Sequence, residues 1–209
     1  IMCLALLAIG GAQNAFAKAP ANGAGFRRIN AVDPVSSHTM DAVVFYPSLA
    51  TANTTPIGPY DIDAVPDAEM APGSHPVILI SHGNGGSQWG HHDLASFLAQ
   101  KGYIVATLSH PGDNFQDSGG AGAVSTLYGR SLQISAVLTA VLNAPFCAAH
   151  IRKDQIGFIG FSAGGTTGLI LAGAKPDLHR LEEYCSTKSS ALPVCQGQGK
   201  IRMDRTDIF

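Results

Sequence analysis

The sequence has 209 residues, of which 45% are hydrophobic and 13% are charged, and its formal net charge at pH 7 is −2. This near-neutral balance supplies no basic face, which argues against a nucleic-acid partner, and the apolar, charge-poor composition argues against a disordered chain. The 24 glycines and 12 prolines stop short of low complexity, so the counts predict one globular domain rich in turns.

The N-terminal segment is predicted to be a targeting sequence. Residues 3–12 form an apolar run, and Ala15-Phe16-Ala17 follows it. An apolar stretch of about ten residues that ends in A-x-A is typical of a signal peptide and its cleavage site, and it is too short to span a bilayer. A buried N-terminal helix is the alternative, but no polar periodicity accompanies the run. We therefore expect residues 1–17 to be a signal peptide with its charged start clipped. We also expect export to the periplasm or the extracellular space, with no transmembrane span.

Residues 18–75 are predicted to hold N-terminal strands and a proline-rich loop. The apolar residues 42–46 predict a strand that ends at Pro47, and residues 26–30 are a candidate for a preceding strand. Between residues 51 and 76 we expect a long loop, because four prolines exclude a helix there: Pro56, Pro59, Pro66 and Pro72.

From residue 76 onward, buried strands alternate with helical patterns. Apolar runs rich in β-branched residues predict strands over residues 77–80, 103–108 and 156–161. Helices are predicted from Ser87 to Gly102 with Leu94, Phe97 and Leu98 on one face, over 131–143 with Leu132, Ser135, Leu138 and Leu142 on one face, and over 162–174. This alternation predicts an α/β protein with a mostly parallel sheet and crossover helices.

The segment Gly160-Phe161-Ser162-Ala163-Gly164 matches the motif G-x-S-x-G. Its place between a predicted strand and a predicted helix is the context that a nucleophile elbow requires. A serine on such a tight turn projects its Oγ above the sheet edge, and Gly160, Gly164 and Gly165 allow the close backbone approach. A glycine turn with an incidental serine is the alternative. We predict that Ser162 is a nucleophile.

A second glycine-rich turn, His82-Gly83-Asn84-Gly85-Gly86, follows the strand predicted at 77–80. Acyl transfer needs backbone N–H donors aimed at the oxyanion, and we predict the N–H groups of Asn84, Gly85 and Ala163. A phosphate loop would need a Lys-Ser/Thr pair, and a dinucleotide site would need three glycines at another spacing. A bare turn remains the other interpretation. No cofactor is implied.

Taken together, the motifs S-H-G-x-G-G (residues 81–86), H-P-G-D-N (110–114) and G-F-S-A-G-G (160–165) resemble a known family. Over about residues 25–175 the sequence resembles the α/β-hydrolases described as predicted dienelactone hydrolases, which are related to platelet-activating-factor acetylhydrolase-like carboxylic ester hydrolases. The resemblance implies the α/β-hydrolase fold, with residues 76–209 as the N-terminal part of its core, and a Ser-Asp-His triad in that chain order. True dienelactone hydrolases carry a cysteine at the elbow, so Ser162 favours an esterase.

The sequence departs from that triad after Ser162. Among the eight histidines only His179 follows it, just past Pro176, where the intervening helix carries it away from Oγ at about 1.5 Å per residue. The acidic residues that follow lie at no identifiable strand end: Asp177, Glu182, Glu183, Asp204 and Asp207. The family places its acid and histidine after later strands. We therefore expect a fragment that lacks those strands, the acid and the base, and that is inactive and poorly folded by itself.

Three further residues are pocket candidates. We expect His82 to anchor the oxyanion loop and His110 to shape the acyl pocket, while Trp89 lines the pocket or covers the core. His91, His92 and Asp93 lack the i, i+4 histidine spacing of a metal site, so a solvated helix cap is preferred and no metal is expected.

The cysteines fit an oxidising compartment. Cys185 and Cys195 flank a polar loop, and a disulfide between them would stabilise the fold by about 3 kcal/mol in the chain-entropy model. Cys147 is left without a predicted disulfide partner. It is either a buried thiol or pairs with a cysteine in another part of the protein.

These features predict an exported serine carboxylic ester hydrolase that acts through an acyl-enzyme on Ser162. The expected substrate is a small neutral or lipid-like ester. Two alternatives stay open: a lipid or polyester hydrolase of the same fold, and a non-catalytic binding module on a hydrolase scaffold. The sequence makes no prediction about the oligomeric state.

Overall fold

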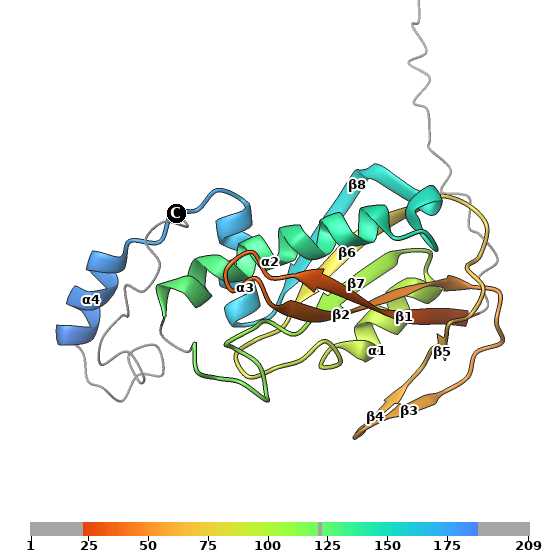
Figure 1. The fold of residues 1–209 in the computed structure, drawn as a ribbon, viewed down its shortest axis with the longest axis horizontal. Helices are drawn as coiled ribbons and strands as arrows, with labels where there is room; N and C mark the ends of the chain where they lie inside the picture. The colour runs from red at the N-terminus through yellow and green to blue at the C-terminus, as the bar shows by residue number, and fades with distance from the viewer. Residues whose placement is uncertain (1–22, 121–122, 188–209) are drawn as a thin grey trace, which may run out of the picture.

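The computed structural model describes residues 23–120 and 123–187, so the predicted signal peptide and Cys195 lie outside the described residues. A six-stranded sheet with the order β5-β1-β2-β7-β6-β8 forms the centre, and β3 and β4 make a separate two-stranded ribbon (Figure 1). The strands are β1 (Gly23–Val32), β2 (Thr39–Ser48), β3 (Thr55–Ile57), β4 (Tyr60–Ile62), β5 (Val65–Pro66), β6 (His75–Ser81), β7 (Ile104–Leu108) and β8 (Ile151–Gly160). The helices are α1 (His92–Gln100), α2 (Val124–Asn143), η1 (Ala148–His150), α3 (Ala163–Leu171) and α4 (Leu178–Thr187).

The strand order reverses at β6. From β6 the chain passes through α1 to β7 on one side, and from β7 it returns through α2 to β8 on the other side of β6. Both pairs are parallel, whereas β1 pairs with β2, and β2 with β7, in antiparallel fashion. The predicted α/β class with crossover helices is confirmed, with an antiparallel N-terminal addition. In open α/β sheets, ligand sites form where the order reverses, at the carboxyl ends of the strands.

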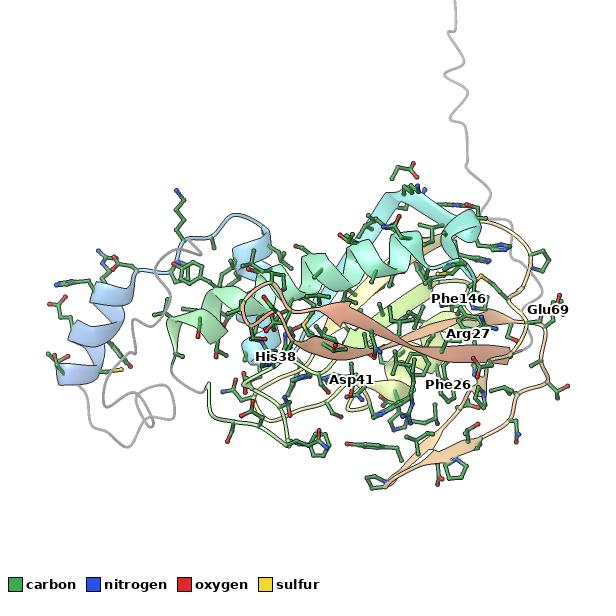
Figure 2. The ribbon with its side chains drawn as sticks, in the orientation of Figure 1. Phe26, Arg27, His38, Asp41, Glu69 and Phe146 are labelled. Atoms are coloured by element: carbon green, nitrogen blue, oxygen red, sulfur yellow. The ribbon has the colours of Figure 1, made fainter. Side chains whose placement is uncertain are left out.

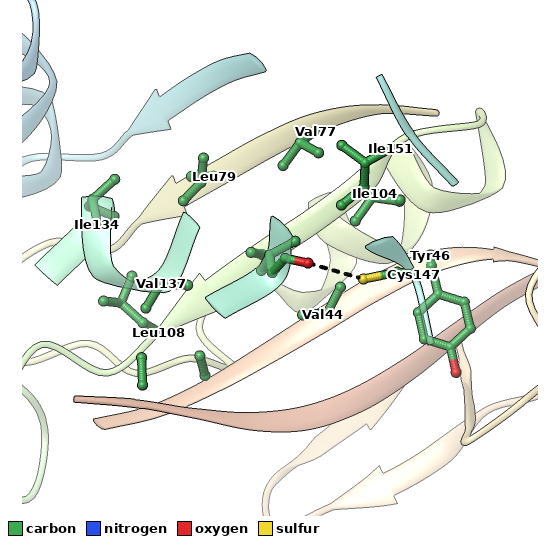
Figure 3. Packing of buried hydrophobic residues seen from close by; sticks show 14 of the residues in the cluster. Val44, Tyr46, Val77, Leu79, Ile104, Leu108, Ile134, Val137, Cys147 and Ile151 are labelled. Carbon is green, nitrogen blue, oxygen red and sulfur yellow. Dashed lines mark hydrogen bonds between the residues drawn. The ribbon is translucent and has the colours of Figure 1, made fainter. Parts of the chain in front are cut away.

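Helices cover both faces of the sheet, and β2 contributes to both cores because its side chains alternate. On one face, Val44 and Tyr46 pack with the α2 residues Ile134, Val137 and Val141 (Figure 3). On the other face, the β2 residues Val43 and Phe45 pack with the α1 residues Ala95 and Ala99. The predicted strand at 42–46 is therefore present, although it runs past Pro47 to Ser48.

Cation–π stacking and an ion pair join β1 to more distant parts of the chain. The Arg27 guanidinium lies 4.9 Å from the centroid of the Phe146 ring, which follows α2 (Figure 2). Its Nε is 3.1 Å from Asp67 Oδ1, in the segment that follows β5. Tyr46 stacks against the same phenyl ring. These contacts hold the N-terminal strands against the helical layer.

Two sequence predictions of element boundaries were wrong. The expected loop at 51–76 contains β3, β4, β5 and the first residues of β6. Two of its prolines, Pro56 in β3 and Pro66 in β5, lie in short, peripheral strands where a missing N–H is tolerated. The helix expected at 131–143 begins at Val124, and its buried side carries Ile134, Val137 and Val141, whereas Ser135 is exposed.

The first crossover helix also differs from its prediction. It begins at His92, because residues near Ser87 form turns, with Ser87 Oγ accepting a hydrogen bond from the Trp89 N–H. Phe97, expected on the buried face, is 53% exposed. The predicted stop at Gly102 agrees with its φ of 99° and its N–H bond to Ala99 O.

Cys147 is a buried free thiol, one of the two states that the sequence left open. Its Sγ donates to Val141 O at 3.5 Å (Figure 3), and burial raises the pKa of the thiol to about 11. The predicted Cys185–Cys195 disulfide lies partly outside the described residues and stays a prediction.

None of the helices that the structure describes combines the length and the apolar character that crossing a bilayer requires.

Candidate active site

Phe161 and Ser162 lie between the end of β8 and the start of α3, and Ser162 has φ 54° and ψ −116°. A positive φ is rare for a residue with a side chain, and such strain clusters at functional sites. Backbone hydrogen bonds enforce the turn, since Gly164 N–H donates to Phe161 O and Gly165 N–H donates to Ser162 O, both at 2.8 Å. The exposed Ser162 side chain therefore projects from the turn, as a nucleophile elbow requires.

Two of the three predicted elbow glycines are sterically required. A Cβ on Gly160 would overlap the carbonyl oxygen of Gly164, and a Cβ on Gly164 would overlap that of Ser81. At Gly165 a Cβ would meet its nearest heavy atom at 3.8 Å, which is an ordinary contact. The close approach of strand, turn and helix thus depends on Gly160 and Gly164.

The glycine-rich turn after β6 passes directly beside the elbow. Ser81 pairs with Gly160 at the ends of β6 and β8, and the Phe161 N–H donates to Ser81 O at 3.1 Å. A Cβ on Gly83 would lie 3.1 Å from Ser162 Cβ. The parallel pairing of the two strands therefore brings together the two motifs that the sequence singled out.

The predicted oxyanion donors differ in availability. The backbone N–H groups of Asn84 and Ala163 make no hydrogen bond within residues 23–120 and 123–187. The Gly85 N–H, in contrast, donates to Asp113 Oδ1 at 3.2 Å. The structure thus differs from the prediction at Gly85, because a carboxylate from a distant loop already occupies that donor.

His82 is held in one tautomer by two hydrogen bonds. Its Nδ1–H donates to Gly83 O at 2.6 Å, and its Nε2 accepts the His110 N–H at 3.1 Å. Burial lowers the pKa of His82 to about 4, so the ring is neutral at pH 7. The neutral ring joins the glycine-rich turn at residues 82–86 to the segment that follows β7.

His110 and Trp89 do not line an open pocket. His110 is fully buried, with Nδ1 donating to Gln133 Oε1 and Nε2 accepting from Ser81 Oγ, both at 2.8 Å. Burial holds the pKa of His110 well below its usual value. Trp89 is 7% exposed and packs edge-on against Phe26 and Phe45, so of its two predicted roles it covers the core.

Sequence reasoning missed Arg130, a buried cation on α2 that contacts both halves of the site. Its side chain is 3% exposed, and its Nη1 lies 2.8 Å from Asp113 Oδ2. The other donors reach Ser81 Oγ at 3.1 Å, His82 O, and Thr167 Oγ1 at 3.1 Å. The only sequence signal was that Arg130 is the one charged residue of this helix, and a single charge on a helix usually points to solvent.

A general base for Ser162 is not among these contacts. No histidine within the described ranges makes a hydrogen bond to Ser162 Oγ, and His82 and His110 use both ring nitrogens elsewhere. His91 touches the Phe161 ring, and His179 is exposed on α4. In the part of the chain that the structure describes, no group of three or more histidine, cysteine or acidic residues could hold a metal ion.

Comparison with known proteins gives structural likeness alone. No family model and no curated protein matches the sequence. A ferulic acid esterase from Streptomyces cinnamoneus matches with a TM-score of 0.56 and 21% identity, over 72% of this chain and 54% of that one. An acylaminoacyl peptidase from Pyrococcus horikoshii matches with a TM-score of 0.51 and 17% identity, over 73% of this chain and 22% of that one. A dienelactone hydrolase-like phosphotriesterase from metagenomic libraries has a TM-score of 0.48 at 17% identity, over 72% and 54% of the two chains.

The chain has part of the α/β-hydrolase fold, as its resemblance to that family implied. It spans about half the length of the ferulic acid esterase that it matches.

Proposed function

We propose that this protein is a serine carboxylic ester hydrolase in which Ser162 forms an acyl-enzyme. The observation that carries the proposal is the strained φ of Ser162 at the β8–α3 junction, beside the unoccupied N–H groups of Asn84 and Ala163. A nucleophile, two backbone donors without a partner in the described residues and the positive end of a helix together suit a negatively charged tetrahedral intermediate.

In the proposed reaction, Ser162 Oγ attacks the ester carbonyl carbon while its proton passes to a histidine. The carbonyl oxygen becomes an oxyanion that accepts hydrogen bonds from Asn84 and Ala163. The C–O bond then breaks, the protonated alcohol leaves, and water hydrolyses the acyl-serine. No histidine of the described residues bonds Ser162, and the described residues include all eight histidines of the sequence. We therefore propose that the base lies C-terminal to Phe209, and that the 209 residues by themselves are inactive and poorly folded.

The proposed substrate is a small neutral or lipid-like ester processed outside the cytoplasm. Low charge, the predicted signal peptide at 1–17 and the esterase among the structural neighbours support this choice. A lipid or polyester hydrolase of the same fold is the variant of this proposal. Assays on esters of increasing acyl length and on a polyester film separate the two.

The test uses the full-length natural protein and p-nitrophenyl butyrate. We expect Ser162→Ala to lower kcat by a factor of about 10³ or more, because the reaction loses its nucleophile. Ser186→Ala is the matched control, since this exposed serine on α4 bonds only its own helix. A fluorophosphonate probe should label Ser162 in the wild type, and peptide mass spectrometry would identify the labelled residue. Full turnover by Ser162→Ala would overturn the proposal.

The absence of a histidine bonded to Ser162 within the described residues favours one other candidate, a non-catalytic binding module on this scaffold. In that case the full-length protein would neither hydrolyse the ester nor react with the fluorophosphonate.

A further inference from the structure

We infer that Arg130 and Asp113 are positioning residues that hold the oxyanion loop, residues 82–86, in register with Ser162. This inference rests on the proposed function. Both side chains are buried, with Arg130 3% and Asp113 5% exposed, and none of their hydrogen bonds reaches Ser162. They act through the backbone groups that they bind.

Asp113 fixes the loop at Gly85. One carboxylate oxygen, Oδ2, accepts from Arg130 Nη1 at 2.8 Å, and the other, Oδ1, accepts the Gly85 N–H at 3.2 Å. Gly85 has φ 68°, a conformation that favours glycine. With the Gly85 N–H bound to Asp113, the preceding Asn84 N–H stays available to an oxyanion.

Arg130 fixes both ends of the arrangement at once. Its Nη2 donates to His82 O, at the start of the loop, and to Ser81 Oγ, at the end of β6. Its Nε donates to Thr167 Oγ1, whose hydroxyl in turn donates to Ala163 O at 3.1 Å. Ala163 carries the second proposed donor, so one guanidinium links the two halves of the oxyanion hole.

The geometry demands arginine rather than any cation. The guanidinium offers donors in a fixed plane, and three of its nitrogens reach four different acceptors here. A lysine would keep the charge but place a single ammonium at one of these points. The pair with Asp113 is neutral overall, which makes its contribution to an oxyanion one of placement rather than of charge.

The test measures kcat and KM for p-nitrophenyl butyrate in the full-length protein carrying Arg130→Lys or Thr167→Val. We expect kcat to fall about 10-fold to 10³-fold with KM changed less than about threefold, because a misplaced oxyanion donor acts mainly on the transition state. Affinity for a trifluoromethyl ketone, which forms a tetrahedral adduct, should fall in parallel. Arg180→Lys is the matched control, since Arg180 pairs with Asp177 on the exposed surface of α4.

A merely structural role would lower the melting temperature and leave kcat per folded molecule unchanged, and that result overturns the inference. The Gly85 amide provides a readout independent of turnover, because Asp113→Ala removes its acceptor and should speed its hydrogen exchange. Unchanged exchange there also overturns the inference. If the wild type shows no turnover, the proposed function fails, while the Gly85 amide still decides whether Asp113 holds the loop.

Discussion

At the scale of single residues, the site depends on backbone geometry more than on side chains. Ser162 has a positive φ in a tight turn between β8 and α3. Backbone hydrogen bonds and two close backbone approaches constrain that turn. Gly160 and Gly164 make those contacts, and Gly165 does not, although all three stand in the same motif. Their consequences for stability should therefore differ.

Replacing Gly164 with alanine should destabilise the fold by about 1–3 kcal/mol, because the new methyl group would overlap Ser81 O. Replacing Gly165 with alanine should be neutral or gain up to about 1 kcal/mol, since its Cβ meets nothing closer than 3.8 Å and alanine favours helix. Urea unfolding of the two full-length variants measures both. Equal free energies of unfolding would contradict this account of the elbow.

The sequence was sufficient to place those residues whose position depends on local order. Ser162 lies between a strand and a helix, and that context, rather than the five-residue motif, placed it at the turn. The strand itself was predicted to be buried, whereas most residues of β8 are exposed. Gly85 and Arg130 could not be assigned in this way. The partner of Gly85 is a carboxylate in another loop, and the partners of Arg130 lie in β6, in α3 and in the loops after β6 and β7. Such contacts depend on tertiary packing, which a linear pattern does not contain.

At the scale of elements, α2 is where periodicity was least informative. The helix carries apolar residues on several sides, including Leu132, Leu138 and Leu142 as well as Ile134 and Val137. Two apolar stripes fit a 3.6-residue period, and the sheet decides between them. Ile134 and Val137 lie in the core, whereas Leu138 and Leu142 pack only at its margin.

Alanine substitutions in the two apolar stripes of α2 should have different effects on stability. Ile134→Ala should lower the free energy of unfolding by about 2–4 kcal/mol, because it removes a 3% exposed side chain from the core. Leu132→Ala, at a partly exposed position of the expected stripe, should cost about 1 kcal/mol or less. Chemical denaturation of each variant is the measurement. A larger loss of stability for Leu132→Ala than for Ile134→Ala would instead support the buried face that the sequence predicted.

At the scale of the whole molecule, the dependence of stability on pH follows from the buried histidines His82 and His110. They lie close to β6, where the strand order reverses. Burial lowers the pKa of His82 to about 4, against 6.5 in an unfolded chain, and holds the pKa of His110 well below its usual value. Between these values the unfolded state binds more protons than the native state. The free energy of unfolding should therefore decrease as pH falls from about 6.5 towards about 4.

From pH 7 to pH 4.5 we expect His82 alone to account for a loss of about 2 kcal/mol, with His110 adding to it. Urea unfolding at several pH values measures the slope. His82→Gln should flatten it in part, while His38→Gln, at an exposed position in the turn between β1 and β2 (Figure 2), should leave it unchanged. A stability that rises on acidification would contradict the neutral state of both rings.

The pairing of Ser81 with Gly160 also has a kinetic consequence. These residues are far apart in the chain, and contacts of that kind form late because the intervening chain must be ordered first. Among the described strands, β8 is an edge strand that pairs only with β6, so it belongs to the segments that open most easily. Each transient fraying of this edge separates the oxyanion loop from Ser162 before the rest of the sheet melts. The proposed catalytic geometry would then exist for only part of the lifetime of the folded chain, and anything that covers β8 would lengthen that part.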